Sequence, residues 1–448
     1  MTRKQARALA AGLVVGPWTE EDLAVRIARA LGKSRPRFRA RSLARRLIRA
    51  LGDGTRPARS IVEAFLFEDG PLRRAWESIP AIRPEPVPDS PVMWPSSGPP
   101  SAWESPALVG TAELAGLLGL SPAELEWFAD VQGRNRRSPD GPLRHYRVLW
   151  RRKRSGEVRV IEVPKARLKA IQRRLLDEIV ARIPPHDAAH GFRPGRSVRS
   201  FASPHVGRPI VLKLDLRDFF PSVSRARIQA LFRTAGYPEP VALALAGLCT
   251  SRVPNDAWDD PNCPSRGGST ELWRLRKRFA LPHLPQGAPT SPALANLAAF
   301  RLDARLTGLA RSAGAIHTRY ADDLAFSGDG EFARKAARFV DHVGAVALEE
   351  GFEVNPRKTR AMRRGVRQRL AGLVVNDRLN LPRDEFDRLK ATLHNCLKTG
   401  PMAQNRGQHA DFRAHLMGRV AHLATVHLDR GKKLAAILAR IDWEVVES

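Results

Sequence analysis

Two adjacent carboxylates, Asp322 and Asp323, lie between apolar and aromatic residues in the stretch 318–327, TRYADDLAFS. The pattern predicts a β-hairpin in which Ala321 ends one strand, the two aspartates occupy the turn, and Leu324 begins the next strand. An isolated pair of this kind is more often a solvated turn. At a strand tip, however, both carboxylates would be open to an ion.

A third carboxylate, Asp215, ends an apolar run in residues 210–220, IVLKLDLRDFF, which reads as a buried strand. Three oxygen donors on two strand ends could hold a pair of Mg²⁺ ions. Two such ions stabilise the attacking and the leaving oxygen in phosphoryl transfer. The residue types therefore point to phosphoryl-transfer chemistry.

The composition fits a large protein that binds a polyanion. The chain has 448 residues, 43 % of them hydrophobic, which is enough to bury the cores of more than one domain. A formal net charge of +29 indicates nucleic acid before membrane as the partner. With only three cysteines at unpaired spacing, neither a disulfide framework nor a zinc site is supported, and we expect a reducing cytoplasm. No apolar run reaches the length that crosses a bilayer.

The elements before the acids divide into an N-terminal part and a second helical part. Residues 1–79 read as a basic helical domain, with Thr19 as a helix cap, and helices in any basic protein look like this whether or not they bind RNA. The Pro/Ser-rich stretch 80–106 reads as a linker. Ser121 begins a helix with a capping box. Residues 146–163 then read as a basic β-hairpin whose turn is Ser155-Gly156.

The elements around and after the acids complete the pattern. Residues 190–197, HGFRPGRS, form a Gly/Arg loop, and residues 252–278 read as an irregular surface loop to which we assign no chemistry. Residues 292–309 and 332–350 read as two helices, and residues 383–443 are helical in pattern. A strand, two helices and a carboxylate hairpin fit an antiparallel sheet with helices on one face.

Four motifs, in this order and spacing, resemble those of bacterial reverse transcriptases. They are the strand that ends at Asp215, residues 284–292 (LPQGAPTSP), the box Tyr320-Ala321-Asp322-Asp323, and residues 355–359 (NPRKT). Any one of them alone would be weak evidence. The resemblance implies an α+β right-hand polymerase with an N-terminal helical extension. Its expected parts are the extension (1–79), the linker (80–106), fingers with leading helices (107–209), a palm with an antiparallel sheet (210–375) and a helical thumb (376–448).

The resemblance also implies the reaction, in which a primer hydroxyl attacks the α-phosphate of a deoxynucleoside triphosphate on an RNA template and expels pyrophosphate. Asp215 and Asp322 would bridge two Mg²⁺ ions, with the carbonyl oxygen of Leu216 as an extra ligand. Asp323 would be a weaker acid, because three carboxylates in one small site repel each other. Lys358 matches a candidate proton donor to pyrophosphate, and a phosphate-binding lysine is the alternative.

Other matched positions concern the nucleotide and the nucleic acid. Arg152 and Arg159 match positions that contact the triphosphate, although contact with the phosphate backbone stays open for Arg152. Phe220 matches the position that excludes a ribose 2′-hydroxyl, while a core role fits neighbouring Phe219 better. Gln286 matches a residue that touches the nucleotide and the primer strand. Template and primer contacts are expected at Arg193, Arg196 and His205.

Among bacterial reverse transcriptases, the chain resembles retron enzymes, in particular the long myxobacterial kind. Two retron marks differ: Phe201 stands at the Asn position of Asn-Ala-x-x-His, and Leu370-Ala371-Gly372 stands where Val-Thr-Gly is usual. Retron membership implies a structured noncoding RNA as primer and template, initiation from a guanosine 2′-hydroxyl and a branched RNA–DNA product. It also implies a role in antiphage defence with a separate effector protein, and no membrane partner.

Two alternatives remain at this point. One is a group II intron-type or abortive-infection reverse transcriptase; we expect no HNH endonuclease and no maturase-like extension, which disfavours an intact intron protein. The other is a noncatalytic RNA-binding scaffold that keeps a polymerase fold. The presence of all three acids argues against the scaffold.

Overall fold

The computed structural model of the chain describes residues 2–14, 18–30, 38–52, 57, 59–77, 105–135, 138, 141–152, 158–260, 263 and 269–443. The predicted linker therefore lies almost wholly outside the described residues. The chain forms two compact units, each built from two segments: unit 1 comprises Met1–Pro184 and Val223–Ser291, and unit 2 comprises Pro185–Ser222 and Pro292–Ser448. These units cut across the five predicted domains, whose boundaries stay a prediction.

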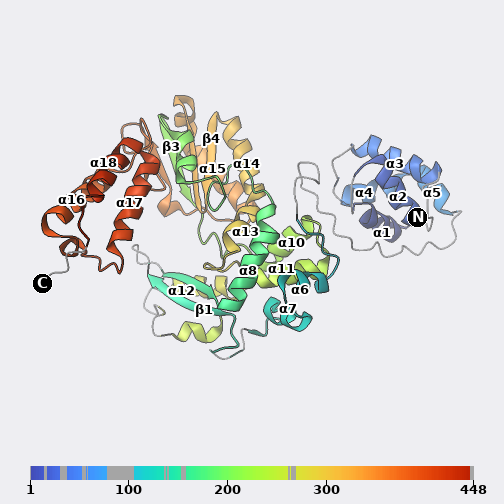
Figure 1. The fold of residues 1–448 in the computed structure, drawn as a ribbon. Helices are drawn as coiled ribbons and strands as arrows, with labels where there is room; N and C mark the ends of the chain where they lie inside the picture. Colours follow the sequence, from blue (N-terminus) through green and yellow to red (C-terminus); the bar gives the residue numbers. More distant parts are fainter. Residues whose placement is uncertain are drawn as a thin grey trace. The chain divides into compact units, whose positions relative to one another are not determined.

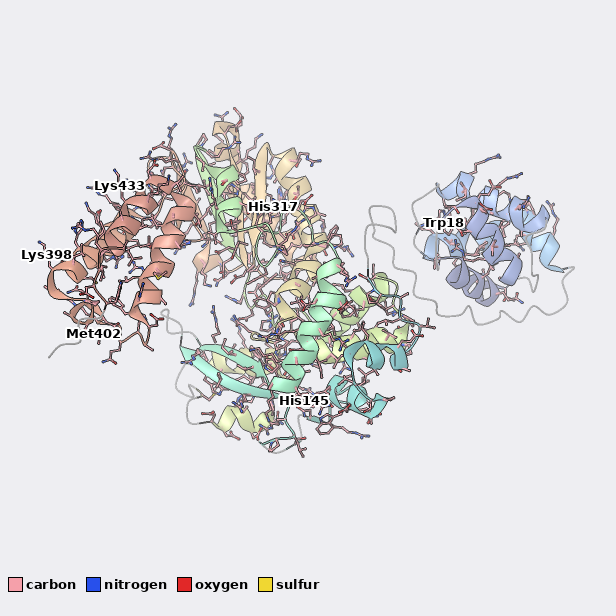
Figure 2. All side chains as sticks on the ribbon, in the orientation of Figure 1. Trp18, His145, His317, Lys398, Met402 and Lys433 are labelled. Atoms are coloured by element: carbon pink, nitrogen blue, oxygen red, sulfur yellow. The ribbon has the colours of Figure 1, made fainter. Side chains whose placement is uncertain are left out.

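Five short helices near the N-terminus share a core of their own (Figure 1). They are α1 (Arg3–Leu13), α2 (Glu20–Ala30), α3 (Phe38–Leu51), α4 (Arg59–Glu68) and α5 (Gly70–Glu77). Thr19 caps α2 as predicted, since its hydroxyl accepts a hydrogen bond from the Asp22 backbone N–H at 3.3 Å. Trp18, labelled in Figure 2, is buried in this core and donates its indole N–H to the Gly52 carbonyl at 3.0 Å.

The rest of unit 1 consists of helices and one β-hairpin. Its first elements are α6 (Thr111–Leu118), α7 (Pro122–Ala129), β1 (Tyr146–Arg152), β2 (Val158–Pro164), α8 (Ala166–Glu178) and η3 (Val180–Arg182). Its later elements are α10 (Arg225–Thr234), α11 (Glu239–Cys249), η5 (Asn255–Asp259) and α12 (Ser269–Phe279). The capping box at Ser121 and the antiparallel β1–β2 hairpin are as predicted, and the turn Ser155-Gly156 lies outside the described residues.

Unit 2 is organised around a four-stranded antiparallel sheet with the order β4-β5-β3-β6. The strands are β3 (Ile210–Asp215), β4 (Ala315–Tyr320), β5 (Asp323–Gly328) and β6 (Arg360–Arg363). β3 is almost continuously buried, which explains its unbroken apolar run. Ahead of β3 lie the short helices α9 (Val198–Ala202) and η4 (Ser203–His205).

Helices α14 (Phe300–Ser312) and α15 (Gly330–Glu349) pack on this sheet, with Phe339 of α15 in edge contact with Phe326 of β5 at 5.1 Å between ring centroids. The single helix expected over residues 292–309 is wrong. The structure has two helices there, α13 (Ser291–Ala298) and α14, because the backbone of Ala299 departs from helical geometry with ψ near 2°. Leu294 of α13 and Leu302 of α14 are both buried on either side of the break.

The C-terminal part of unit 2 is mainly helical from residue 383 onward, as predicted. It contains η6 (Pro356–Lys358), the small hairpin β7 (Arg369–Leu370) and β8 (Leu373–Val374), α16 (Arg383–Thr399), η7 (Met402–Gln404), α17 (Phe412–Val426) and α18 (Leu428–Leu438). The apolar positions at helical spacing form one core, which includes Leu389, Leu393, Leu416, Val420 and Leu423. No helix in the described ranges is both long and apolar enough to cross a membrane.

Candidate active site

The sheet of unit 2 brings the three predicted acids together. Asp215, the last residue of β3, lies directly opposite Asp323, the first residue of β5. Directly opposed residues of antiparallel strands point to the same face, with Cα atoms about 4.5–5.5 Å apart. Asp322 immediately precedes Asp323, and its carbonyl accepts a hydrogen bond from the Leu216 N–H at 2.8 Å. The carboxylates therefore meet at one end of two neighbouring strands.

The turn of the hairpin is shifted by one residue from the prediction. Ala321 and Asp322 form the turn, whereas Asp323 already belongs to β5. Ala321 has a φ of 54°, which costs an L residue about 1–2 kcal/mol. Because the turn ends one residue earlier, Asp323 takes a fixed place in the strand register opposite Asp215.

A buried arginine holds this strained turn. Arg319 on β4 donates to the Ala321 carbonyl at 3.0 Å and to Asn296 Oδ1 at 3.0 Å. Its other nitrogens make a bidentate ion pair with Asp303 on α14, at 2.7 and 2.6 Å, and both side chains are fully buried. Sequence reasoning missed Asp303, since a single acid in an amphipathic helix carries no signal of its partner.

The three carboxylates repel one another because they carry like charge. Burial, together with the neighbouring Asp215 and Asp323 carboxylates, raises the pKa of Asp322. Burial also raises the pKa of Asp323, against the opposing effect of Lys213, whose Nζ lies 3.0 Å from the Asp323 carboxylate. Lys358 places its Nζ 3.0 Å from the Asp215 carboxylate. Two lysines therefore compensate part of the negative charge that the strand ends concentrate.

The expected RNA contact of His205 is wrong, because its side chain is fully buried. Its ring nitrogens lie 2.7 Å from the hydroxyl of Thr318 on β4 and 2.7 Å from the hydroxyl of Ser327 on β5. Burial lowers the pKa of His205 to about 3, so the ring is neutral at pH 7. Phe201, the departure from the retron pattern, packs on Tyr320 with ring centroids 5.8 Å apart. This segment therefore supports the β4–β5 hairpin from inside the protein.

An aromatic cluster lies beside the acids. Phe220 is half-buried and lies 6.2 Å, ring to ring, from the half-exposed Phe192, which in turn lies 6.2 Å from Tyr320. Phe219 is buried against Phe352, so the expectation that Phe219 rather than Phe220 serves the core is confirmed. Phe192 was missed because the Gly/Arg loop was interpreted through its glycines and arginines alone.

The two arginines of that loop are oriented by one acid. Arg193 and Arg196 lie 3.4 and 3.8 Å from the Asp187 carboxylate. The Asp187 side chain is itself 86 % exposed, so these ion pairs are weak and both guanidinium groups can exchange this partner for a phosphate. The structure thus leaves both positions available for nucleic acid.

The nucleotide-contact candidates of unit 1 lie on and beside the β1–β2 hairpin. Arg159 is exposed on β2, and nothing beyond its strand position is described for Arg152. The Gln286 carbonyl accepts a hydrogen bond from the Glu162 N–H at 3.0 Å. A Cβ at Gly287 would come within 2.6 Å of the Glu162 carbonyl, so only glycine allows this approach.

A buried ion pair locks the same loop to β2. His283 Nε2 lies 2.7 Å from Glu162 Oε2, and both side chains are essentially inaccessible. Burial by itself lowers the pKa of His283, but the Glu162 carboxylate and hydrogen bond outweigh it, and the net pKa is raised. Unit 1 therefore fixes Gln286 and Arg159 on one rigid support.

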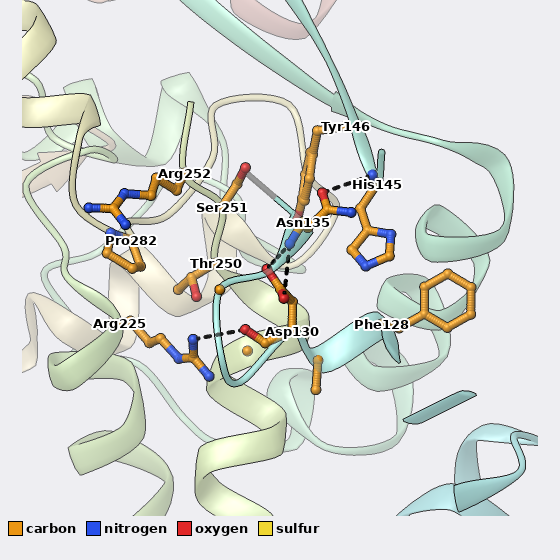
Figure 3. Close-up of a pocket in the computed structure, with 13 residues that line it drawn as sticks. Phe128, Asp130, Asn135, His145, Tyr146, Arg225, Thr250, Ser251, Arg252 and Pro282 are labelled. Carbon is orange, nitrogen blue, oxygen red and sulfur yellow. Dashed lines mark hydrogen bonds between the residues drawn. The ribbon is translucent and has the colours of Figure 1, made fainter. Parts of the chain in front are cut away.

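A separate polar pocket of unit 1 surrounds Arg225 (Figure 3). Arg225 Nη1 donates to the carbonyls of Asp130 and Val131 at 3.3 Å each. Burial lowers the pKa of this arginine. Since the Asp130 carboxylate in turn accepts the backbone N–H groups of Arg134 and Asn135, the pocket is part of the connection between α7 and β1. None of the predicted site residues lines it.

Among the residues that the structure describes, no three His, Cys, Asp or Glu side chains are arranged as a ready-made metal cage. The acids nevertheless suit Mg²⁺, which is usually held by one or two carboxylates together with waters and substrate phosphates. The raised pKa values of Asp322 and Asp323 mark negative charge that a cation would neutralise.

Comparison with known proteins identifies the family. A family profile described as "Reverse transcriptase (RNA-dependent DNA polymerase)" matches residues 151–389, more than half of the chain. That match fits the predicted right-hand polymerase fold, and the observed helices with antiparallel sheets agree with an α+β class. A solved structure of telomerase from Candida albicans with a fragment of telomeric RNA also matches, with 11 % identity over 65 % of this chain and 56 % of that chain; its TM-score is 0.32, so nothing rests on it.

Curated relatives narrow the family further. The Retron Mx65 reverse transcriptase of Myxococcus xanthus is 42 % identical over 72 % of this chain and 70 % of its own length. The Retron Mx162 reverse transcriptase of the same organism is 38 % identical over 73 % and 66 %. The Retron Ec86 reverse transcriptase of Escherichia coli is 29 % identical over 58 % and 74 %. The predicted resemblance is thereby confirmed: the chain belongs to the reverse transcriptases, is an RNA-directed DNA polymerase, and is of the retron type.

Proposed function

We propose that this polymerase copies a structured noncoding RNA into single-stranded or branched DNA at Asp215, Asp322 and Asp323, as the reverse transcriptase of a retron. The observation that carries the proposal is the register of β3 against β5, which sets Asp215 opposite Asp323 with Asp322 in the adjoining turn. Three carboxylates at one strand end are costly unless a cation neutralises them. A purely structural role would not explain why three carboxylates lie so close together.

The residues that would hold two Mg²⁺ ions are Asp215 and Asp322 through their carboxylates and Leu216 through its carbonyl oxygen, with Asp323 as the weaker acid. Bound there, the ions would lower the pKa of the primer hydroxyl and neutralise charge on the triphosphate. The chain's own part is to hold the carboxylates rigidly. Arg319 does so through the Ala321 carbonyl, and Asn355 does so through the backbone carbonyl of Asp215, to which its N–H donates at 2.7 Å.

Lys358 is proposed as the proton donor to the leaving pyrophosphate. Its Nζ lies 3.0 Å from Asp215, within the region where the triphosphate would bind. A positioned donor of this kind contributes about 10²–10⁴-fold to the rate. The ion pair with Asp215 holds the Lys358 amine beside the acids before a nucleotide arrives. Phosphate binding without proton transfer remains the second role for this lysine.

Nucleotide selection is proposed for Phe220, Arg159, Arg152 and Gln286. The half-buried ring of Phe220 would contact the sugar and exclude a 2′-hydroxyl, so that deoxynucleotides are preferred. The exposed Arg159 would bind the triphosphate, and Gln286 would contact the nucleotide from a loop that is hydrogen-bonded to β2. Arg193 and Arg196 would bind template and primer through phosphate oxygens.

Primer extension tests the catalytic assignment. A DNA primer annealed to an RNA template is incubated with deoxynucleotides and Mg²⁺, and Asp322→Ala is compared with the wild type. Asp341→Ala is the matched control, since Asp341 is exposed on α15 of the same unit. We expect no extension with Asp322→Ala and wild-type extension with Asp341→Ala. Equal incorporation by wild type and Asp322→Ala would favour the noncatalytic RNA-binding scaffold.

The retron assignment has its own test. Nucleic acid that survives purification with the protein is sequenced and treated with ribonuclease and with debranching enzyme. A small DNA joined through a guanosine 2′-hydroxyl to a structured RNA supports the retron, whereas a linear copy of a different RNA would favour an intron-type or abortive-infection enzyme. Loss of phage resistance on deletion of the gene or of a neighbouring effector gene would support the proposed defence role.

A further inference from the structure

Residues 252–278 were expected to be an irregular surface loop, but the described parts of this segment, 252–260, 263 and 269–278, line an aromatic and basic groove. The segment contains η5 and α12, which face each other across a hollow of about 370 Å³. That volume is within the range of ligand sites. The groove, here called the α12 groove, is lined among others by Asn255, Trp258, Asp259, Trp273, Arg276 and Lys277.

One wall of the α12 groove is anchored in a packed core. Trp258 is buried and contacts Trp150 of β1 edge-on, with ring centroids 5.0 Å apart. Phe279 lies 6.4 Å from the same ring, and Leu272 and Leu275 of α12 pack against this cluster at helical spacing. The groove therefore belongs to a helix whose inner face is fixed to the β1–β2 hairpin.

The outer face of α12 carries an exposed aromatic ring and basic side chains instead of apolar core residues. Trp273 is 60 % exposed, and Lys277 Nζ lies 5.0 Å from the centroid of its ring. Arg276 lies with its guanidinium carbon 5.6 Å from the ring of Trp258. A lone exposed tryptophan is ordinary. An indole face next to a hollow and two cations is what a base and its phosphates require.

We propose that the α12 groove binds single-stranded RNA, with one base stacked on Trp273 and the flanking phosphates at Arg276 and Lys277. RNA is favoured over DNA because Asp259, exposed in the same groove, offers a carboxylate that can accept a hydrogen bond from the ribose 2′-hydroxyl, which DNA lacks. The groove shares no residue with the three acids. Its ligand binding needs neither metal nor nucleotide, so the inference stands independently of the catalytic assignment.

Binding to the full-length protein tests this. A fluorescein-labelled unstructured RNA of about 8 nucleotides, a length within the range of single-strand sites, is titrated without Mg²⁺ and deoxynucleotides and followed by anisotropy. Trp273→Ala removes one stacked base and is expected to weaken binding about 5- to 150-fold. Lys277→Gln removes one phosphate contact and is expected to lower the slope of log Kd against log salt by about 0.7.

Matched controls separate the groove from general charge and general aromaticity. Arg274→Gln removes the same charge from an exposed position of α12 outside the groove. Trp127→Ala removes a tryptophan that is 44 % exposed on α7. We expect both to bind the RNA like the wild type, with unchanged thermal unfolding of all four variants.

Because the cations of a chain with net charge +29 can attract RNA phosphates at more than one place, the site is also mapped directly. RNA that carries 4-thiouridine is crosslinked, and the crosslinked peptide is identified by mass spectrometry. A crosslink within residues 269–280 that disappears in Trp273→Ala supports the proposal. It is overturned if no crosslink falls there, if Arg274→Gln and Lys277→Gln weaken binding equally, or if DNA of the same sequence binds as tightly as RNA.

Discussion

The buried pair of Arg319 and Asp303 offers the sharpest test of how the hairpin that carries Asp322 and Asp323 is held. Replacing Asp303 by Leu leaves a fully buried guanidinium without its bidentate partner. Breaking a buried pair by removing one member costs about 3–5 kcal/mol. Since tenfold corresponds to 1.4 kcal/mol, opening of the β4–β5 hairpin should become about a hundredfold to several thousandfold more frequent.

The double variant Arg319→Met/Asp303→Leu distinguishes charge from packing. It removes both buried charges, and the Ala321 carbonyl becomes the main unsatisfied group, at about 1–3 kcal/mol. We therefore expect the double variant to be more stable than Asp303→Leu alone. Its polymerase activity should nevertheless stay low, because the carbonyl that Arg319 held in the φ 54° turn is released and a misplacement of about 1 Å can cost about 10²-fold.

Hydrogen exchange measured by mass spectrometry on peptides that cover β4 and β5 is the appropriate assay, because a chain with two units need not unfold in one step. Primer extension is measured in parallel. The single variant Arg319→Met is measured as well. The reasoning is refuted if the loss of stability in the double variant equals the sum of the losses in the two single variants, or if the double variant regains wild-type activity along with its stability.

Three further predictions concern charge and backbone. Because the pKa of Asp322 is raised in the fold, its ionised form opposes folding above that pKa, so Asp322→Asn should raise the melting temperature in metal-free buffer. Mg²⁺ at 100 times its Kd should add about 2.7 kcal/mol to the wild type and much less to this variant. Because the pKa of His283 is raised in the fold, protonated His283 contributes its full stabilisation below pH 6.5. That stabilisation is lost as the pH rises through the higher pKa of the folded state. Urea titrations at a series of pH values should show this loss of unfolding free energy in the wild type and no such loss in His283→Gln. Ala371 has a φ of 43° in the β7–β8 turn before Gly372, a conformation that Asn adopts more readily than Ala. Ala371→Asn should therefore raise the free energy of unfolding by about 0.5–1 kcal/mol. An unchanged or lower urea midpoint would contradict this.

Strands, hairpins and helix caps were predictable from the sequence, whereas contacts between residues far apart in the chain were not. The acids, the β3 run and the hairpin each follow from short patterns of alternating or continuous apolar residues. The caps at Thr19 and Ser121 follow from side chains three residues apart. Such signals depend only on neighbours in the chain. The structure confirms the strands and the caps, with the turn of the hairpin shifted by one residue.

The errors arose where tertiary contacts decide. His205 was expected to contact template or primer, but its ring is buried and lies within hydrogen-bond distance of two hydroxyls, from β4 and β5. In the sequence Asp303 is a single acid in an amphipathic helix, and only the structure shows that it forms a buried ion pair with Arg319. The insertion lacked clear periodicity, yet Trp150 and Phe279 give α12 a core to pack on. In each case the partner lies on another element.

The strand order of unit 2 has a consequence for how the enzyme is made. β3 occupies an inner position of the sheet, but both of its neighbours, β5 and β6, come later in the chain. During synthesis β3 therefore leaves the ribosome before β5 and β6, the strands that pair with it. Until they emerge, the backbone N–H and C=O groups and the apolar side chains of β3 have no partner in the sheet. Non-local pairing of this kind is slow and exposes sticky surface. Asp215 should consequently meet Asp322 and Asp323 only after residue 328 has emerged, and the sheet is complete only after residue 363. Nascent chains that stop before β5 should depend on chaperones to stay dispersed.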